Sequence, residues 1–132
     1  MRRVHRKELL GMFYKGETLS DLDLTGIDLS GLDLRHAMLS ECKLNGANLK
    51  GTNLEGSVLI RSHLEDSDLT GAYLTGAFLG ESNLTGADLR GAHLLGADLQ
   101  YAILTSADLR GANLTGAKLK GSNIEDALLN DS

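Results

Sequence analysis

The 132-residue sequence contains no proline and no tryptophan, and it has only one cysteine, two phenylalanines and three tyrosines. The absence of proline excludes collagen-like and proline-rich linker composition, although sixteen glycines are present. Cys42 cannot form an intramolecular disulfide and has no partner at metal-ligand spacing, which favours a reducing compartment. No stretch approaches the roughly 18 apolar residues that span a bilayer. The sequence therefore predicts a cytoplasmic protein that is not embedded in a membrane.

The charges are divided unevenly along the chain. The formal net charge is −5, of which residues 1–16 contribute +4 and residues 17–132 contribute −9. Because affinity for nucleic acid comes from basic side chains that displace counterions from phosphates, an acidic body argues against direct nucleic acid binding. Arg2 and Arg3 are reminiscent of a twin-arginine signal, but polar residues occupy 5–8, where an apolar segment would have to follow. No export signal is expected.

A five-residue period dominates the sequence. Leucine occupies every fifth position from Leu19 to Leu129, with Ile124 as the exception, which gives 23 consecutive repeats. Two residues before this central position, only Ala, Ser, Thr or Cys occurs from Ala37 to Ala127. The residue just before the centre is Asp or Asn in twelve repeats, and the residue two after it is Gly in thirteen.

Period five fits neither a helix nor a straight strand, so the backbone must turn once in each repeat. The central leucine and the small residue two before it then point inward, while the other three positions point outward. Glycine two after the centre stands where a tight turn requires a positive φ, and Asp or Asn before the centre can bond turn amides. Where Glu41, Arg61, Asp66, Glu81 or Tyr101 replaces this glycine, we expect a different turn type.

Three pentapeptides carry a family resemblance: 47–51, 87–91 and 112–116 read Ala-Asn-Leu-Lys-Gly, Ala-Asp-Leu-Arg-Gly and Ala-Asn-Leu-Thr-Gly. They resemble the A(D/N)LXX signature of the pentapeptide-repeat family. The resemblance covers residues 17–131 and implies an all-β fold, a right-handed quadrilateral β-helix with four repeats in each coil and about six coils. The chain departs from the family pattern in having no Phe at a central position, and in the bulky Leu22, Ile27 and Leu32 near its start.

The two ends of the solenoid are expected to differ. Leu9, Met12 and Phe13 recur at helical spacing and Gly16 stands at a helix C-cap position, so residues 1–16 are predicted to form a helix that caps the first coil. Residues 17–132 form the predicted β-helix. No comparable cap follows Leu129, so the last coil is either frayed or covered by a second molecule, which would make a homodimer.

With twenty residues in each coil, residues twenty apart stack in ladders on the outer faces. Met38, Val58 and Phe78 then lie in one ladder, with Ile60 beside them, and Tyr101 and Ile103 lie beyond, near the next corner. Single exposed apolar residues are ordinary, but stacked neighbours mark interfaces. These six residues are the predicted binding surface for a protein partner that the sequence does not identify.

A second face carries acidic residues, and two interpretations of it stay open. Asp28, Asp68, Asp88 and Asp108 would stack in one row, which could imitate a strand of phosphates. Lys50, Arg90 and Arg110 are interleaved with them, and solvation together with turn formation explains the same row. The family resemblance implies the alternative function, because some members bind DNA gyrase as DNA mimics and protect it from fluoroquinolones.

The sequence contains no recognisable catalytic arrangement. His5, His36, His63 and His93 fall in the first segment or on different faces, so no two are expected to converge on a metal or a nucleophile. The glycines do not form a phosphate-binding loop, and no cofactor is expected. We therefore predict a protein that is not an enzyme and that acts as an interaction or scaffold module.

Overall fold

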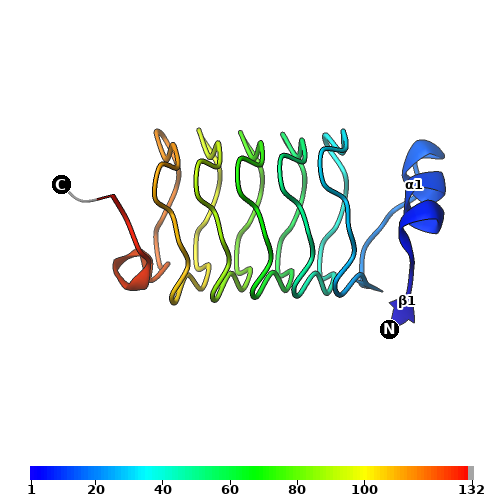
Figure 1. Cartoon of the computed structure of the whole chain (residues 1–132), viewed down its shortest axis with the longest axis horizontal. Coiled ribbons are helices and arrows are strands. Elements are labelled where there is room, and N and C mark those ends of the chain that lie inside the picture. Colours follow the sequence, from blue (N-terminus) through cyan, green and yellow to red (C-terminus); the bar gives the residue numbers. More distant parts are fainter. Residues whose placement is uncertain (131–132) are drawn as a thin grey trace.

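The computed structural model describes residues 1–130, which form a rod of stacked coils with a helix at one end (Figure 1). The regular elements are few: β1 (Arg2–Arg3), α1 (Arg6–Tyr14), β2 (Leu22–Asp23) and the 3₁₀-helix η1 (Ile124–Asp126). Between β2 and η1 the chain runs through coils that are joined by isolated parallel bridges. Within residues 1–130 no helix has the length and apolar character needed to cross a membrane.

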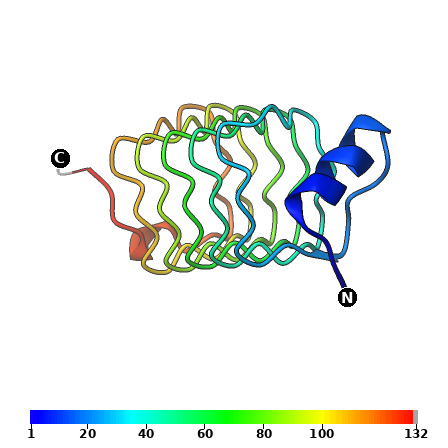
Figure 2. The same cartoon turned by 45° about the vertical axis from the view of Figure 1, so that its right-hand side comes forward.

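Backbone hydrogen bonds join residues of successive coils at a constant spacing. Asn48 bridges both Asp28 and Asp68 in parallel, each twenty residues away, and the other bridges of the solenoid keep this spacing. The Leu49 N–H donates to the Asp68 carbonyl at 2.7 Å, and the Asp68 N–H donates to the Ala47 carbonyl at 2.9 Å. A repeat of five residues therefore makes a coil of four repeats, so the coils stack directly over one another (Figure 2).

The interior is filled as the five-residue pattern predicts. Central leucines from Leu19 to Leu109 are at most 2% exposed, and the small residues two before them are buried over most of the rod. Where that small residue is polar, its hydroxyl usually finds a carbonyl: Thr52 donates to Leu29 O at 2.8 Å and Ser62 to Leu59 O at 2.7 Å. These bonds keep the buried hydroxyls from being left without an acceptor.

The corners use one turn regardless of whether glycine is present. Gly51 has φ +64°, and the Thr52 N–H closes the turn on the Leu49 carbonyl at 3.1 Å. Arg61 has φ +54°, and the Ser62 N–H closes its turn on Leu59 at 3.1 Å in the same way. The expectation of a different turn type is therefore wrong at all five corners for which it was made: Glu41, Arg61, Asp66, Glu81 and Tyr101 all have φ between 54° and 63°.

That expectation fails because the bonds between coils outweigh the local cost of the conformation. A left-handed residue that carries a side chain costs about 1–2 kcal/mol, but in this conformation the Arg61 N–H donates to the Gly80 carbonyl of the next coil at 2.9 Å. A different turn would break the register of the coil with both neighbours. Asp21, His36 and Ser106 share the same positive φ.

The N-terminal segment packs on the first coil. β1 pairs in parallel with β2, Arg2 opposite Leu22, and α1 follows directly. Leu9 of α1 is 0% exposed, and Leu10, Met12 and Phe13 pack partly buried against the core. In the first coil Leu22 and Ile27 are buried and Leu32 is half-buried.

The end of α1 has the hydrogen bonds that its sequence predicts. Gly16 has φ +74° and donates its N–H to the Phe13 carbonyl at 3.0 Å, while the Glu17 N–H donates to the Met12 carbonyl at 3.0 Å. These two bonds form a Schellman motif, with Gly16 directly after the C-cap residue Lys15.

At the C-terminal end of the rod the central residues of the last coil are less buried than those of the preceding coils. Leu114, Leu119 and Ile124 are only half-buried, and Leu128 and Leu129 are 50% and 42% exposed. Two asparagine side chains bond backbone N–H groups of the preceding coil: Asn123 accepts from Leu104 at 2.6 Å and Asn130 accepts from Gly111 at 2.8 Å. The predicted last residue of the β-helix, Ser132, lies outside the described residues.

Candidate functional site

Three residues of the predicted binding surface lie in one ladder. Met38 bridges Val58, Val58 bridges Phe78, and Phe78 bridges Asp98 on the next coil. Met38 is 51% and Phe78 is 46% exposed, while Val58 is half-buried. Parallel strand spacing places each of these side chains about 4.8 Å from the next, so they form a continuous row.

Ile60 and Tyr101 lie beside this row, whereas Ile103 lies in another. Half-buried Ile60 and exposed Tyr101 both line a hollow together with Phe78. Ile103 is 44% exposed but bridges Asn83, in the ladder that also contains His63. We call Met38, Val58, Ile60, Phe78 and Tyr101 the apolar surface, and Ile103 lies outside it on the neighbouring row.

The hollow in this surface has apolar and charged walls. It is lined by residues of three successive coils, which are Ile60, Arg61, Phe78, Gly80, Glu81, Asp98, Gln100 and Tyr101. Phe78 and Ile60 supply apolar area, while Glu81 and Asp98 supply carboxylates. The hollow is open to solvent, so it can receive a side chain from outside.

A charged ladder borders the hollow along the corner. The Arg61 guanidinium donates from Nε to Glu41 at 3.1 Å and from an Nη to Glu81 at 3.1 Å. These carboxylates raise the pKa of Arg61, through hydrogen bonds first and charge second. All three side chains are more than half exposed, so the ladder adds little to stability.

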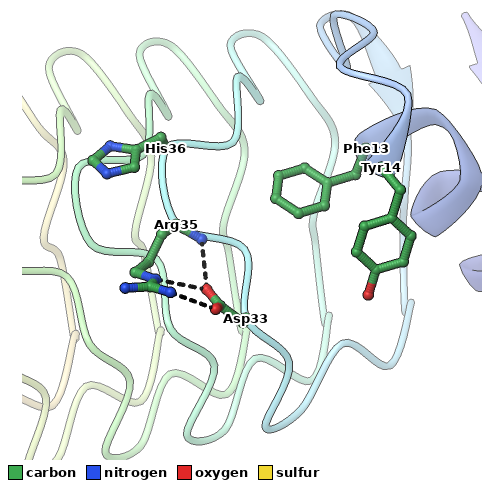
Figure 3. Close-up of a pocket in the computed structure, with 5 residues that line it drawn as sticks. All are labelled: Phe13, Tyr14, Asp33, Arg35 and His36. Carbon is green, nitrogen blue, oxygen red and sulfur yellow. Dashed lines mark hydrogen bonds and ion pairs between the residues drawn. The ribbon is translucent and has the colours of Figure 1, made fainter.

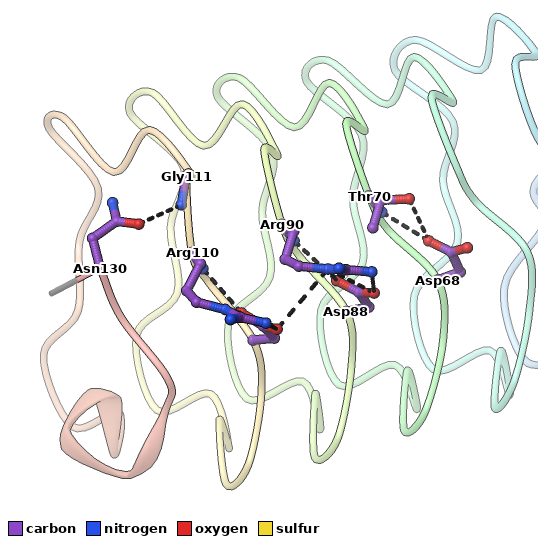
Figure 4. Close-up of polar contacts among 8 residues, drawn as sticks. Asp68, Thr70, Asp88, Arg90, Arg110, Gly111 and Asn130 are labelled. Carbon is purple, nitrogen blue, oxygen red and sulfur yellow. Dashed lines mark hydrogen bonds and ion pairs between the residues drawn. The ribbon is translucent and has the colours of Figure 1, made fainter.

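The acidic row on the face of Asp88 and Asp108 is engaged within the rod (Figure 4). Arg90 donates from Nη2 to Asp88 at 2.7 Å, and Arg110 makes the same bond to Asp108 at 2.7 Å. The hydrogen bonds from Arg90 and Arg110 hold the pKa values of Asp88 and Asp108 below their usual range. Asp68 is held instead by Thr70, whose hydroxyl donates at 2.6 Å. Asp68, Asp88 and Asp108 each also accept the backbone N–H of the residue two later, so they take part in the turns.

A second hollow lies between α1 and the nearby coils (Figure 3). Phe13 and Tyr14 face it from α1, and Asp33, Arg35 and His36 face it from the coil. Arg35 donates from Nη2 to Asp33 at 2.9 Å, so both charges are already paired. This hollow follows from the packing of the helix on the rod.

Sequence reasoning missed another exposed group. The rings of Tyr73 and His93 stack with centroids 4.6 Å apart and planes 2° from parallel, and Leu95, two residues after His93, is 45% exposed. The spacing of twenty between Tyr73 and His93 is the signal that could have found the pair. His63 lies in a different ladder, 3.5 Å from Glu65, and among residues 1–130 no three His, Cys, Asp or Glu side chains gather as a metal site.

Stacked coils of parallel bridges around a leucine core define the class of β-helical repeat solenoids. Within this class the model of the family described as pentapeptide repeats matches residues 19–56, 62–99 and 92–131, in 8 copies. The chain therefore belongs to the pentapeptide-repeat family, as its sequence indicates. No curated protein matches the chain.

Solved structures of pentapeptide repeat proteins share the fold. Rfr23 of the cyanobacterium Cyanothece 51142 is 27% identical with a TM-score of 0.69, and the match covers 82% of this chain and 91% of that chain. A protein of the Arabidopsis thaliana thylakoid lumen is 35% identical with a TM-score of 0.58 over 72% of this chain and 63% of that chain. QnrB1, a plasmid-mediated fluoroquinolone resistance protein, is 20% identical with a TM-score of 0.56 over 92% of this chain and 67% of that chain. These likenesses support the right-handed β-helix.

The family matches leave out one short stretch inside the repeat region. Residues 57–61, Ser-Val-Leu-Ile-Arg, fall between the first match and the second. This stretch contains Val58 and Ile60 of the apolar surface and Arg61 of the charged ladder. Ser57 and Leu59 keep the small residue and the central leucine of the repeat in this stretch.

Proposed function

We propose that this chain is a non-enzymatic interaction module that binds a protein partner through the apolar surface. The row of Met38, Val58 and Phe78 is the observation that carries the proposal, since each residue stacks on the next and the two end residues are about half exposed. Stacked exposed apolar side chains are stabilised when a partner removes them from water.

The fold gives this surface the properties of a docking site. Its side chains project from coils whose backbone is hydrogen-bonded on both sides, so little conformational entropy is lost when a partner binds. Aromatic anchors surrounded by polar groups are typical of interface centres, and Phe78 has Glu81, Asp98 and Gln100 around it.

A charge placed in the row tests the proposal. Phe78→Glu is expected to abolish capture of partner proteins by the immobilised chain, since a carboxylate would be desolvated in the interface. Tyr73→Glu is the matched control, because Tyr73 occupies the same repeat position and is also 46% exposed. Capture that is equal for wild type and Phe78→Glu would contradict the proposal, as would equal loss in both variants.

The alternative function, binding of DNA gyrase as a DNA mimic, stays a prediction. The likeness to QnrB1 is 20% in sequence and shows a common fold only. A mimic needs free carboxylates in a row, and here Asp88 and Asp108 each bind an arginine of the rod. A supercoiling assay with fluoroquinolone present tests it: protection of gyrase would support mimicry, and no protection would eliminate it.

Four finer features belong to the same proposal. The helix α1 acts as a cap, which is supported by the burial of Leu9, and the repeats make about six coils, which is supported by the spacing of twenty between bridges. A cytoplasmic location is supported by the single reduced cysteine, Cys42. Contact with a second copy through the last coil is supported by the exposure of Leu128 and Leu129.

A further inference from the structure

The floor of the hollow is a glycine that the backbone does not require. The other glycines of the repeats lie at corners with positive φ, whereas Gly80 follows a central leucine and has no such φ. A Cβ atom at Gly80 would meet only the Gln100 carbonyl oxygen, at 3.6 Å, which is ordinary contact. Alanine would fit there without strain, so the effect of Gly80 is to leave open the space between Ile60 and Gln100.

The carboxylate of Asp98, which also lines the hollow, lacks the side-chain hydrogen bond that the other aspartates at the same repeat position accept. Aspartate just before a central leucine accepts a side-chain hydrogen bond from the residue two later in six places, at Asp23, Asp28, Asp33, Asp68, Asp88 and Asp108. Asp98 is the seventh, and the residue two later is Gln100, which gives it only a backbone N–H bond to Oδ1 at 3.0 Å. Among residues 1–130 no side chain forms a hydrogen bond or an ion pair with Asp98.

The rod itself shows which group fits such an aspartate. Arg90 and Arg110 each place Nε and Nη2 on the two oxygens of the carboxylate two residues before, Arg110 at 2.9 and 2.7 Å. This bidentate geometry is stronger and more specific than a single contact. At Asp98 the position of that arginine is taken by an uncharged glutamine, and the hollow opens next to it.

We propose that the hollow binds an arginine side chain of a protein partner, with its guanidinium on Asp98 and its aliphatic stem over Gly80 between Ile60 and Phe78. This inference rests on the proposed function and identifies the side chain that the apolar surface receives. The guanidinium gains a second attraction from the face of a nearby aromatic ring, since Phe78 and Tyr101 both line the hollow. Glu81 is bonded to Arg61, so Asp98 supplies the free carboxylate.

The test uses the full chain and three short peptides. Acetylated peptide amides of sequence Ala-Leu-X-Leu-Ala, with X as arginine, lysine or citrulline, are titrated into the ¹⁵N-labelled protein. The arginine peptide is expected to shift the amide signals of Gly80, Glu81 and Gln100. The lysine peptide should bind more weakly because it cannot form the bidentate pair. The citrulline peptide, which carries the uncharged isostere of arginine, should lose affinity by roughly tenfold or more.

Two pairs of variants locate the effect. Gln100→Arg recreates the Asp-Leu-Arg sequence of residues 88–90, so it should occupy Asp98 from within and abolish binding of the arginine peptide. Thr115→Arg adds the same charge on another face and should leave binding unchanged. Gly80→Gln fills the hollow and should also abolish binding, whereas Thr115→Gln, at the same repeat position, should not.

The outcomes separate this inference from the proposed function. Equal shifts with arginine and citrulline, or unchanged binding in Gln100→Arg and Gly80→Gln, would overturn the inference. If Phe78→Glu abolishes partner capture while the arginine peptide does not bind, the apolar surface is an interface and the arginine assignment is wrong. If the arginine peptide binds as expected while Phe78→Glu leaves capture intact, the site stands and the proposed docking surface fails.

Discussion

Each corner of a coil contains one residue with a strained, positive φ. The side chain stacked on it from the neighbouring coil also affects which residue fits there. His36 has φ +64°, and its ring lies over the backbone of Gly56, the residue at the same corner of the next coil. A Cβ atom at Gly56 would overlap that ring, whereas a Cβ atom at Gly51, with nearly the same φ, would meet nothing within 4 Å. The position of the His36 ring therefore favours glycine at position 56, whereas the corner of Glu41, Arg61 and Glu81 carries a side chain on successive coils.

This difference gives a prediction for two alanine variants. Gly51→Ala is expected to lower the free energy of unfolding by about 1 kcal/mol, the cost of a left-handed residue with a side chain. Gly56→Ala should lower it further, because the His36 ring must also move. In a His36→Ala background the two variants should become equal in urea unfolding. A difference that persists in that background would show that the ring is not its cause.

The central leucine positions tolerate substitution less than the corners do, because a polar atom in the interior of the coil would be buried without a hydrogen-bond partner. Leu74 is 0% exposed, and Leu74→Asp would bury a carboxylate without a partner at a cost of several kcal/mol, comparable to the roughly 5–15 kcal/mol that stabilises a domain. We expect this variant to be unfolded by circular dichroism. Tyr73→Asp places the same group one residue earlier, facing outward, and should remain folded. A Leu74→Asp melt that matches the wild type would contradict the β-helix.

Whether a residue points inward or outward could be predicted from the sequence, because the five-residue period alone determines it. The inward positions follow from the five-residue pattern, and the burial of Leu74 and Ala72 confirms them. The conformation at Arg61 could not be predicted, because local preference opposes it and the bonds to neighbouring coils enforce it. The hydrogen-bond partner of an outward side chain could not be predicted either, since the sequence does not show whether the Gln100 side chain bonds to Asp98.

Among the elements, α1 differs from the repeats in how it is held. It contributes one fully buried residue, Leu9, while Leu10, Met12 and Phe13 are partly buried against the core. Leu9→Ala is expected to cost about 2–5 kcal/mol and to expose the first coil. Hydrogen exchange should then speed up at Leu24 and Gly26 of that coil, whereas Lys7→Ala, an exposed change in the same helix, should leave their exchange unchanged. Unaltered protection in Leu9→Ala would mean that α1 does not cap the solenoid.

The ladders of Asp and Arg make the face of Asp88 and Asp108 sensitive to acid. Hydrogen bonds from Arg90 and Arg110 lower the pKa values of both carboxyls in the folded chain. Their contribution is therefore fully present above the unfolded pKa of about 4 and is lost as pH falls through the lower folded values. The melting temperature should fall below about pH 4. Asp88→Asn with Asp108→Asn should reduce that fall, and an equal fall in this double variant would assign the acid sensitivity to other groups.

Over the whole molecule, the solenoid is uniform inside and unequal at its ends. The five-residue repeat made the rod predictable, and the helical spacing of Leu9, Met12 and Phe13 made the N-terminal helix predictable. The Asn123 and Asn130 side chains that bond to the last coils could not be foreseen, since asparagine serves turns elsewhere in the same pattern. At each end of the rod a coil has a neighbour on one side only. The five-residue period therefore predicts the structure of the ends less well than that of the middle.

The open coil leads to the last prediction, that two copies of the chain meet through it. Leu128 and Leu129 are 50% and 42% exposed, and Leu114, Leu119 and Ile124 behind them are half-buried, so a second copy would cover a coherent apolar area. Light scattering on the 132-residue chain should give twice the 14.1 kDa chain mass. Leu128→Glu with Leu129→Glu should give a monomer with the wild-type circular dichroism spectrum. Tyr73→Glu, which adds a carboxylate to a side face, should leave the dimer intact. A wild-type chain that remains monomeric as its concentration is raised would rule out this contact.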